Sequence, residues 1–238
     1  NLELVPTAFA RIFQGAFDFQ AIFAGFTGSA LMQGIKRGLF SNEAGVGSAP
    51  NAAASANVSH PVKQGLVQML AVFIDTLLIC SATALMLLCS GVEPTEAAQG
   101  APYVQSALSA VFGSVGPIFI TVAMVLFAFT TLIGNYYYCE GCLRFIFKRI
   151  PSHNFMTGFR IVAAIVAMRG AIITMQLAWD TADLFQALMV IINVPVILIL
   201  SRTAVKVLKD YTTQRKAGKN PEFKSANVGL EGKTEAWE

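Results

Sequence analysis

Charged residues are scarce in this sequence. They make up 13% of the 238 residues, against about 25% in an average soluble domain. Hydrophobic residues make up 55% of the chain, and the mean hydropathy is +0.59. So little charge cannot cover a solvated surface, so the composition argues against an ordinary soluble protein and predicts a membrane protein.

The sequence also lacks the short motifs of common enzymatic chemistry. It has no Walker phosphate-binding loop, no zinc-binding H-E-x-x-H and no G-x-S-x-G nucleophile elbow. Its two histidines, His60 and His153, fall in predicted loops without a metal-ligand partner at a recognisable spacing. We therefore predict that the chain is not an enzyme, has no cofactor and has no nucleic-acid partner.

Disulfide and targeting signals are missing as well. The four cysteines lie in or beside apolar stretches, which argues against a secreted disulfide framework. Cys139 and Cys142 fit C-x-x-C, but without a second ligand pair we interpret them as inert thiols. No signal peptide is visible, and because the chain opens at Asn1 without an initiator Met, we expect an N-terminal portion to precede it.

Four apolar runs approach the length of about 20 residues that crosses a bilayer. They are Leu66–Ser90, Val115–Cys139, Phe159–Trp179 and Leu184–Ser201. We predict transmembrane helices over residues 65–90, 115–143, 159–179 and 182–202. Residues 91–114 then form a loop, and residues 203–238 a basic tail that begins as a short helix and grades into disorder.

The N-terminal part of the chain is less clearly patterned. Asn1–Phe17 has the pattern of an amphipathic helix. Asp18–Ile35 is apolar but rich in small residues, so it either spans the membrane or lies in the interface. We predict that residues 1–35 form an amphipathic or apolar segment that is external or interfacial.

The most unusual pattern lies between Gly34 and Pro50, where four glycines and a proline surround a Ser-Asn-Glu triplet. Glycine and proline destabilise a continuous helix, and backbone groups freed at membrane depth must be buried or line a wet cavity. In transporters such interrupted helices bind a substrate and its coupling ion. The alternative is an interfacial loop in which Glu43 is solvated.

Single polar residues within the apolar runs carry the same ambiguity. Asp75 is either part of a pathway or a structural bond between helices. Thr131 and Asn135 share a helix face, and adjacent hydroxyls at Thr130 and Thr131 suit a hard cation such as sodium. The alternative is that these hydroxyls bond to their own helix.

Two other features receive no functional role. Arg169 lies within an apolar run, where it either snorkels or pairs with Asp180 or Asp183. We interpret Asn193-Val194-Pro195 as a kink that satisfies its own backbone, and predict no site there.

Basic residues predict the orientation in the membrane. Lys and Arg gather at residues 144–160 and after Ser201, whereas Gly91–Ser114 contains none. By the positive-inside rule, the first two regions are cytoplasmic and residues 91–114 are external. His60 and Lys63 then also lie on the cytoplasmic side.

The string from Gly38 to Pro50 closely resembles the hallmark of the alanine-or-glycine:cation symporters, the sodium:alanine symporter family. Further matches follow in order: His60–Leu66, Phe73–Leu77, Phe127–Tyr138, and Trp179 with Ala182–Leu184. The resemblance covers nearly the whole chain up to about Lys206, and its first string is highly specific.

The resemblance implies an all-α membrane protein with the leucine-transporter fold, built from two inverted five-helix repeats. This chain resembles the second, C-terminal repeat, with residues 36–58 as its discontinuous transmembrane helix. Lys36 and Arg37 are then external or in an outer vestibule; if Asp18–Ile35 is instead a full span, both residues lie on the inside. The missing N-terminal repeat of the same protein is an expected partner, without which this chain alone should not transport.

The same resemblance implies roles for individual residues. The amino-acid pocket would be lined by Phe40, Ser41, Asn42, Glu43, Gly45 and Asn135. Sodium would be held by Thr130 and Thr131, and Asp75 is a further polar residue within the membrane.

We therefore predict sodium-coupled symport of a small neutral amino acid, alanine or glycine, by alternating access. The predicted location is the bacterial cytoplasmic (inner) membrane, where the chain crosses the lipid bilayer several times and the C-terminus is cytoplasmic. The alternative is an ion channel or pore subunit without a coupled substrate, which needs no carboxylate-binding interrupted helix.

Overall fold

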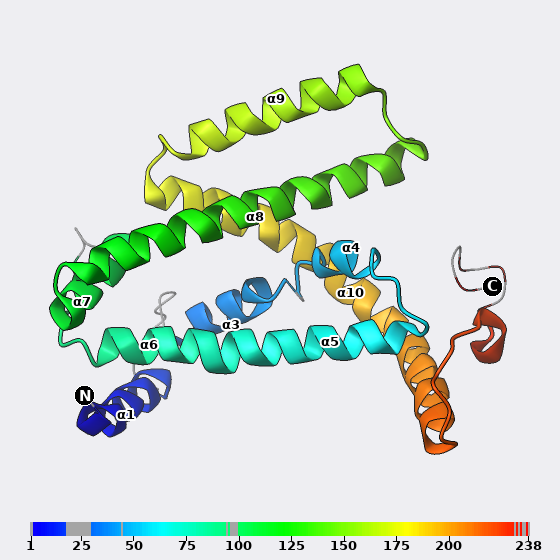
Figure 1. Ribbon diagram of the computed structural model, residues 1–238, viewed down its shortest axis with the longest axis horizontal. Helices are drawn as coiled ribbons and strands as arrows, with labels where there is room; N and C mark the ends of the chain where they lie inside the picture. The colour runs from blue at the N-terminus through cyan, green and yellow to red at the C-terminus, as the bar shows by residue number, and fades with distance from the viewer. Residues whose placement is uncertain are drawn as a thin grey trace. The chain divides into compact units, whose positions relative to one another are not determined.

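The regular secondary structure of this chain is helical (Figure 1). The structure, a computed structural model, describes residues 2–17, 30–43, 45–93, 95, 100–230, 232, 234 and 237. The all-α prediction is confirmed for these residues. Part of the predicted segment 1–35, namely Asn1 and Asp18–Ser29, lies outside the described ranges.

The helices and their bounds are as follows. In chain order they are a 3-10 turn Leu2–Leu4, α1 Val5–Ala16, α3 Ala30–Ser41, α4 Ala49–Ala53, α5 Pro61–Phe73, a π-helix Ile74–Cys80, α6 Ser81–Leu88, α7 Ala101–Phe112, α8 Val115–Phe147, α9 His153–Gly170, α10 Met175–Lys216 and a 3-10 turn Ser225–Val228. Three of the described helices are long and apolar enough to cross a membrane: Pro61–Leu88, α8 and α10.

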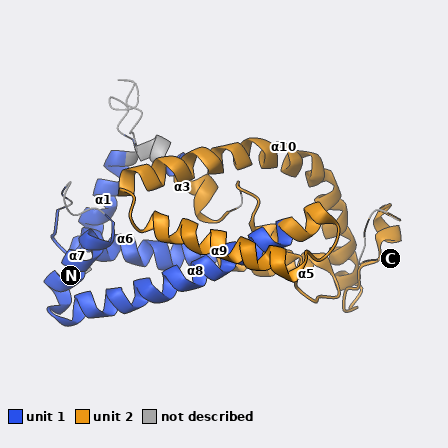
Figure 2. Ribbon diagram, turned by 90° about the horizontal axis from the view of Figure 1, so that it is seen from above, with its two compact units in different colours: residues 1–36, 73–142 blue, residues 37–72, 143–238 orange. Residues whose placement is uncertain are grey.

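These helices belong to two compact units (Figure 2). The first contains residues 1–36 and 73–142, and in it Arg11 of α1 pairs with Glu93 at 3.6 Å, beyond the end of α6. α7 and α8 form a hairpin in which Gly116 lies against the Leu108 carbonyl, too close for a Cβ atom. Within residues 91–114, which were predicted to form a loop, the structure describes the helix α7. The Arg11–Glu93 pair places α1 beside the first residues of this segment.

The second unit contains residues 37–72 and 143–238, with α9 and α10 as its longest helices. Both begin at a side-chain cap: Ser152 Oγ accepts from the Phe155 amide, and Thr174 Oγ1 accepts from the Leu177 amide, each at 3.4 Å. The break between the two helices thus falls at residues 171–174. The apolar runs predicted this break at residues 180–181, because hydropathy does not identify Thr174 as a helix cap.

The described residues that follow α10 directly, 217–230, do not form the disordered tail expected from their polarity. α10 extends to Lys216, and the chain then folds back so that the Phe223 amide bonds to the Ser59 carbonyl at 2.9 Å. Lys63 Nζ also donates to Asn220 Oδ1 at 2.8 Å. The expectation of disorder is wrong for Pro221–Val228, because the segment finds partners at the start of α5 that no local pattern predicts.

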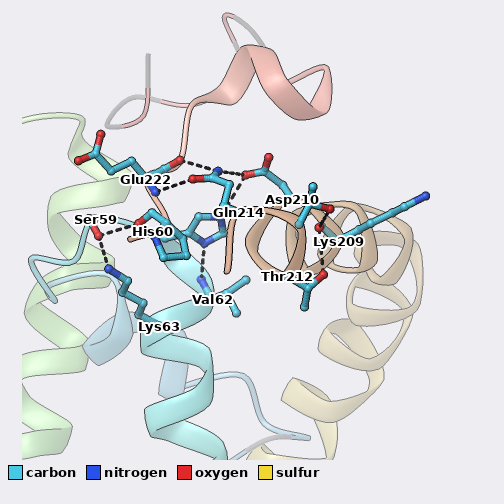
Figure 3. Close-up of polar contacts among 11 residues, drawn as sticks. Ser59, His60, Val62, Lys63, Lys209, Asp210, Thr212, Gln214 and Glu222 are labelled. Carbon is cyan, nitrogen blue, oxygen red and sulfur yellow. Dashed lines mark hydrogen bonds and ion pairs between the residues drawn. The ribbon is translucent and has the colours of Figure 1, made fainter. Parts of the chain in front are cut away.

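His60 lies at the centre of this contact (Figure 3). It is fully buried, its Nε2 lies 3.3 Å from Asp210 Oδ2, and its ring meets the rings of Tyr211 and Phe223 edge to face. Gln214 bonds both to Asp210 Oδ2 and to the backbone of Glu222. We call this group, with His60, Asp210, Tyr211, Gln214 and Phe223 as members, the His60 cluster.

The apolar surface of the long helices remains uncovered. No residue in the most apolar part of Pro61–Leu88 or of α10 is buried, and few are in α8. An apolar surface of this extent is not stable against water. It suits contact with lipid chains or with other membrane helices.

Candidate functional site

The candidate site is a non-helical turn between two short helices. α3 ends at Ser41 and α4 begins at Ala49, and we call residues 42–48 the interrupted turn; of these, Ala44 lies outside the described residues. Pro50 is in the first turn of α4, where its missing amide costs nothing. The glycine and proline pattern thus coincides with a real break in the helix.

Left-handed backbone conformations shape the interrupted turn. Glu43 has a φ of 56° and Gly47 a φ of 84°, and such a conformation costs any residue but glycine about 1–2 kcal/mol. The Gly45 amide bonds to the Leu39 carbonyl at 3.2 Å, and the Gly47 amide to the Glu43 carbonyl at 2.8 Å. The Glu43 carboxylate accepts from Ser48 Oγ at 2.7 Å, so it holds the turn together rather than projecting into water.

The interrupted turn lies against α10 at Asn193. The side-chain Nδ2 of Asn193 donates to the Gly45 carbonyl at 2.9 Å. The Asn193 amide group also lies directly over Gly47, where a Cβ atom would be 2.5 Å from Oδ1. Gly45 is buried in this contact.

A second contact with α10 lies before the interrupted turn. Arg37 of α3 pairs with Asp183 at 3.4 Å, and its guanidinium lies 4.3 Å from the centre of the Trp179 ring. Ion pairing and cation–π attraction therefore act on the same side chain. Asp180, by contrast, accepts a hydrogen bond from Gln176 on its own helix. Arg169 lies in the last turn of α9, where the helix dipole stabilises a positive charge.

The contacts of residues 37–60 with α10, including the His60 cluster, occur in the same order along both segments. Arg37 meets α10 at Asp183, the interrupted turn meets it at Asn193, and His60 meets it at Asp210. On an α-helix, Asp183 and Asp210 are about 40 Å apart, whereas the hydrocarbon core of a bilayer is about 30 Å thick. The part of α10 that residues 37–60 contact is therefore longer than the hydrocarbon core of a bilayer is thick.

The interrupted turn opens onto a cavity of about 740 Å³. Its lining includes Glu43, Gly47, Pro50, Gln64, Gln68 and Asn193. The cavity thus lies next to the break and beside the start of α5, and it combines a mainly apolar wall with a few polar groups. Small-molecule sites commonly have this composition and size.

The predicted site residues fall into two groups. Phe40 and Ser41 end α3, and Asn42, Glu43 and Gly45 lie in the interrupted turn, so these five residues are close together in the second unit. Thr130, Thr131 and Asn135 lie on α8 in the first unit, as does Asp75 in the π-helix. A site that joins the two groups stays a prediction.

The α8 hydroxyls show one of the two alternatives left open by the sequence. Thr130 Oγ1 donates to the Leu126 and Phe127 carbonyls at 3.0 and 3.1 Å, which is bonding within the helix. The Thr130 hydroxyl oxygen can still coordinate a cation, because its two lone pairs are not used when the hydroxyl donates. Thr131 and Asn135 are exposed on the described surface.

Asn193 was not among the predicted site residues. The pattern Asn193-Val194-Pro195 predicted a kink without a site, whereas the structure places the Asn193 side chain on the interrupted turn. A signal was present, since an amide in the middle of the charge-free run Leu184–Ser201 needs a hydrogen-bond partner. The π-helix at Asp75 left no such sign in the sequence.

Comparison with known proteins identifies the relatives of this chain. The profile of the sodium:alanine symporter family matches residues 1–225. The chain is 44% identical over 238 residues to the amino-acid carrier protein AlsT of Bacillus subtilis, covering all of this chain and 50% of that protein. It is 46% identical over 223 residues to a protein of the same organism named "Probable sodium/glutamine symporter GlnT", covering 94% of this chain and 46% of that one.

An archaeal relative is similar at lower identity. The sodium/alanine symporter AgcS of Methanococcus maripaludis is 36% identical over 219 residues, which cover 91% of this chain and 47% of that protein. The chain spans about half the length of these curated relatives. No solved structure matches it.

Proposed function

Since this chain belongs to the sodium:alanine symporter family, we propose that it supplies half of a symporter that couples sodium entry to uptake of a small neutral amino acid. Alanine is the first candidate and glycine the second. One of the relatives is named for glutamine, so the test of this proposal must also compare substrates of different side-chain size.

One observation carries this proposal: the interrupted turn meets α10 near the middle of its apolar run. Asn193 lies halfway along Leu184–Ser201, and the contacts at Asp183 and Asp210 lie on either side of it. A break at this depth offers main-chain groups to a solute within the membrane. A loop in the interface would not meet the middle of a membrane helix, so this geometry favours a discontinuous transmembrane helix over residues 36–58.

The chemistry of the substrate fits such a break. A zwitterionic amino acid needs donors for its carboxylate and acceptors for its ammonium, and unpaired backbone groups at helix ends supply both. Phe40, Ser41, Asn42, Glu43 and Gly45 would line this pocket, with Asn135 beside the substrate. Thr130 and Thr131 would offer hard oxygen ligands to sodium, and bound sodium would offset the charge of the carboxylate.

The wider architecture is part of the same proposal. The chain would form the second of two inverted five-helix repeats, with a broken helix in each repeat at the central site. Transport would follow from alternating exposure of that site to the two sides of the cytoplasmic membrane.

Uptake into proteoliposomes tests the proposal. The complete protein would be reconstituted, and uptake of labelled alanine measured under an inward sodium gradient and after full replacement of sodium by choline or potassium. We expect saturable uptake with sodium only, with competition by unlabelled alanine, glycine, serine and glutamine ranking the substrates. Equal uptake without sodium would contradict sodium coupling, and a flux that does not saturate would favour a pore.

A further inference from the structure

We propose that Asn193 is a positioning residue that holds the interrupted turn in the shape that binds substrate. The inference rests on the proposed function and adds to it a residue on α10. It assigns to Asn193 a role in affinity, exerted through the backbone of Gly45 and Gly47.

The first step is the hydrogen bond. Asn193 Nδ2 donates to the Gly45 carbonyl at 2.9 Å, which fixes one of the few carbonyls that the break sets free. An amide in an apolar helix face costs several kcal/mol unless it is bonded. The bond therefore stabilises α10 and the interrupted turn together.

The second step is steric. Gly47 leaves no room beyond its own backbone, because a Cβ atom there would lie 2.5 Å from Asn193 Oδ1 and 2.6 Å from Cγ. The Gly47 amide in turn bonds to the Glu43 carbonyl. The Asn193 amide thus contacts Gly47, which is hydrogen-bonded to Glu43. A shift of the Asn193 side chain would therefore move both Gly47 and Glu43.

The third step is the location of this contact. Asn193, Gly47 and Glu43 all line the cavity of about 740 Å³. Pro195, two residues further along α10, has no amide hydrogen, so the regular bond to the Ile191 carbonyl is absent and the helix can adjust here. α10 follows a curved path (Figure 2). A side chain at this point sets the distance between helix and turn, and with it the shape of the cavity wall.

Kinetics of two variants test the role. In the complete protein, Asn193→Ala and the longer apolar Asn193→Leu remove the donor. We expect the half-saturation for alanine to rise about 3- to 10-fold, the loss expected from one hydrogen bond, with the maximal rate within about twofold of the parent. Ser201→Ala is the matched control, because its hydroxyl bonds only to Leu198 of its own helix.

Hydrogen exchange gives a readout that needs no transport. The amides of Gly45 and Gly47 should exchange faster in both variants than in the parent, and not in Ser201→Ala. An unchanged half-saturation, a loss confined to the maximal rate, or unchanged exchange at these amides would each overturn the inference. If the parent itself shows no sodium-dependent uptake, the proposed function fails, and exchange alone decides on the role of Asn193.

Discussion

Gly47 is a residue of the interrupted turn that has no space for a side chain beside α10. Its φ of 84° lies in the left-handed region, and a Cβ atom would meet the Asn193 amide. We expect Gly47→Ala to destabilise the protein by about 1–3 kcal/mol and to weaken substrate binding. The midpoint of thermal unfolding in detergent and the half-saturation for alanine would measure the two effects.

Two comparisons sharpen this prediction. Gly38→Ala is the control, since Gly38 lies within α3 with no atom within 4 Å of the added Cβ, and alanine favours a helix by about 1 kcal/mol. In a protein that already carries Asn193→Ala, Gly47→Ala should cost less, because part of the clash is gone. Equal costs in both backgrounds would show that the two residues do not interact.

Thr131 is predicted to be a sodium ligand. If it is, Thr131→Val keeps the shape of the side chain but removes the oxygen, and should raise the sodium half-saturation by at least about tenfold. Thr121→Val is the matched control on the same helix, because its hydroxyl bonds to the Pro117 carbonyl and to Gln105. An unchanged sodium half-saturation in Thr131→Val would remove this residue from the site.

Residue by residue, the sequence predicted the location of the break better than its partners. Glycines and Pro50 mark residues 42–48 because their backbone preferences are local. That Glu43, in addition to Gly47, takes a left-handed conformation, with Ser48 bonded to its carboxylate, depends on contacts within the folded turn. The contact with Asn193 joins residues far apart in the chain, which no local pattern encodes.

At the scale of elements, the His60 cluster joins three segments: the start of α5, the end of α10 and the residues that follow it. His60→Ala removes a fully buried side chain with its bond to Asp210, at a cost of about 1–3 kcal/mol. Local opening of residues 219–228 should therefore increase about 5- to 100-fold. Hydrogen exchange at the Phe223 amide, which bonds to Ser59, would measure it.

The other histidine provides the control for this prediction. His153 is exposed in the first turn of α9, so His153→Ala should leave exchange at Phe223 unchanged. If His60→Ala also has no effect there, the segment after α10 is held by the backbone bond of Phe223 to Ser59 and by the Gln214 side chain rather than by His60.

The existence of the long helices could be predicted more reliably than their ends. α8 was expected over residues 115–143 and runs over Val115–Phe147, because a continuous apolar run identifies a helix but not its polar last turn. The start of α10 after the cap Thr174 and its extension to Lys216 both involve polar residues, which an apolar run does not mark. The π-helix at Ile74–Cys80 depends on one residue's shift in hydrogen bonding, for which the sequence shows no sign.

For the whole molecule, the scarcity of charge was sufficient to predict the class. The chain is a multi-pass membrane protein of a transporter family, which agrees with the predicted class and with the absence of enzymatic motifs. The inverted repeat cannot be deduced from this half alone, because symmetry between repeats needs both. It stays part of the proposal.

Contacts within each unit are consistent with the orientation predicted from the basic residues. In one unit Arg11 of α1 pairs with Glu93; the segment of Arg11 was predicted to be external or interfacial, and that of Glu93 external. In the other, Lys63 meets Asn220 of the C-terminal segment, and both were predicted to be cytoplasmic. Had a contact joined segments assigned to opposite sides of the membrane, the positive-inside assignment would fail.

Thiol labelling tests this orientation directly. In the complete protein with its native cysteines replaced by serine, Glu93→Cys and Lys219→Cys would each supply one exposed thiol. We expect a membrane-impermeant maleimide to label position 93 in intact right-side-out vesicles, and position 219 only after the membrane is permeabilised, because basic segments are retained in the cytoplasm. Labelling of position 219 in intact vesicles would contradict the predicted cytoplasmic location of the C-terminus.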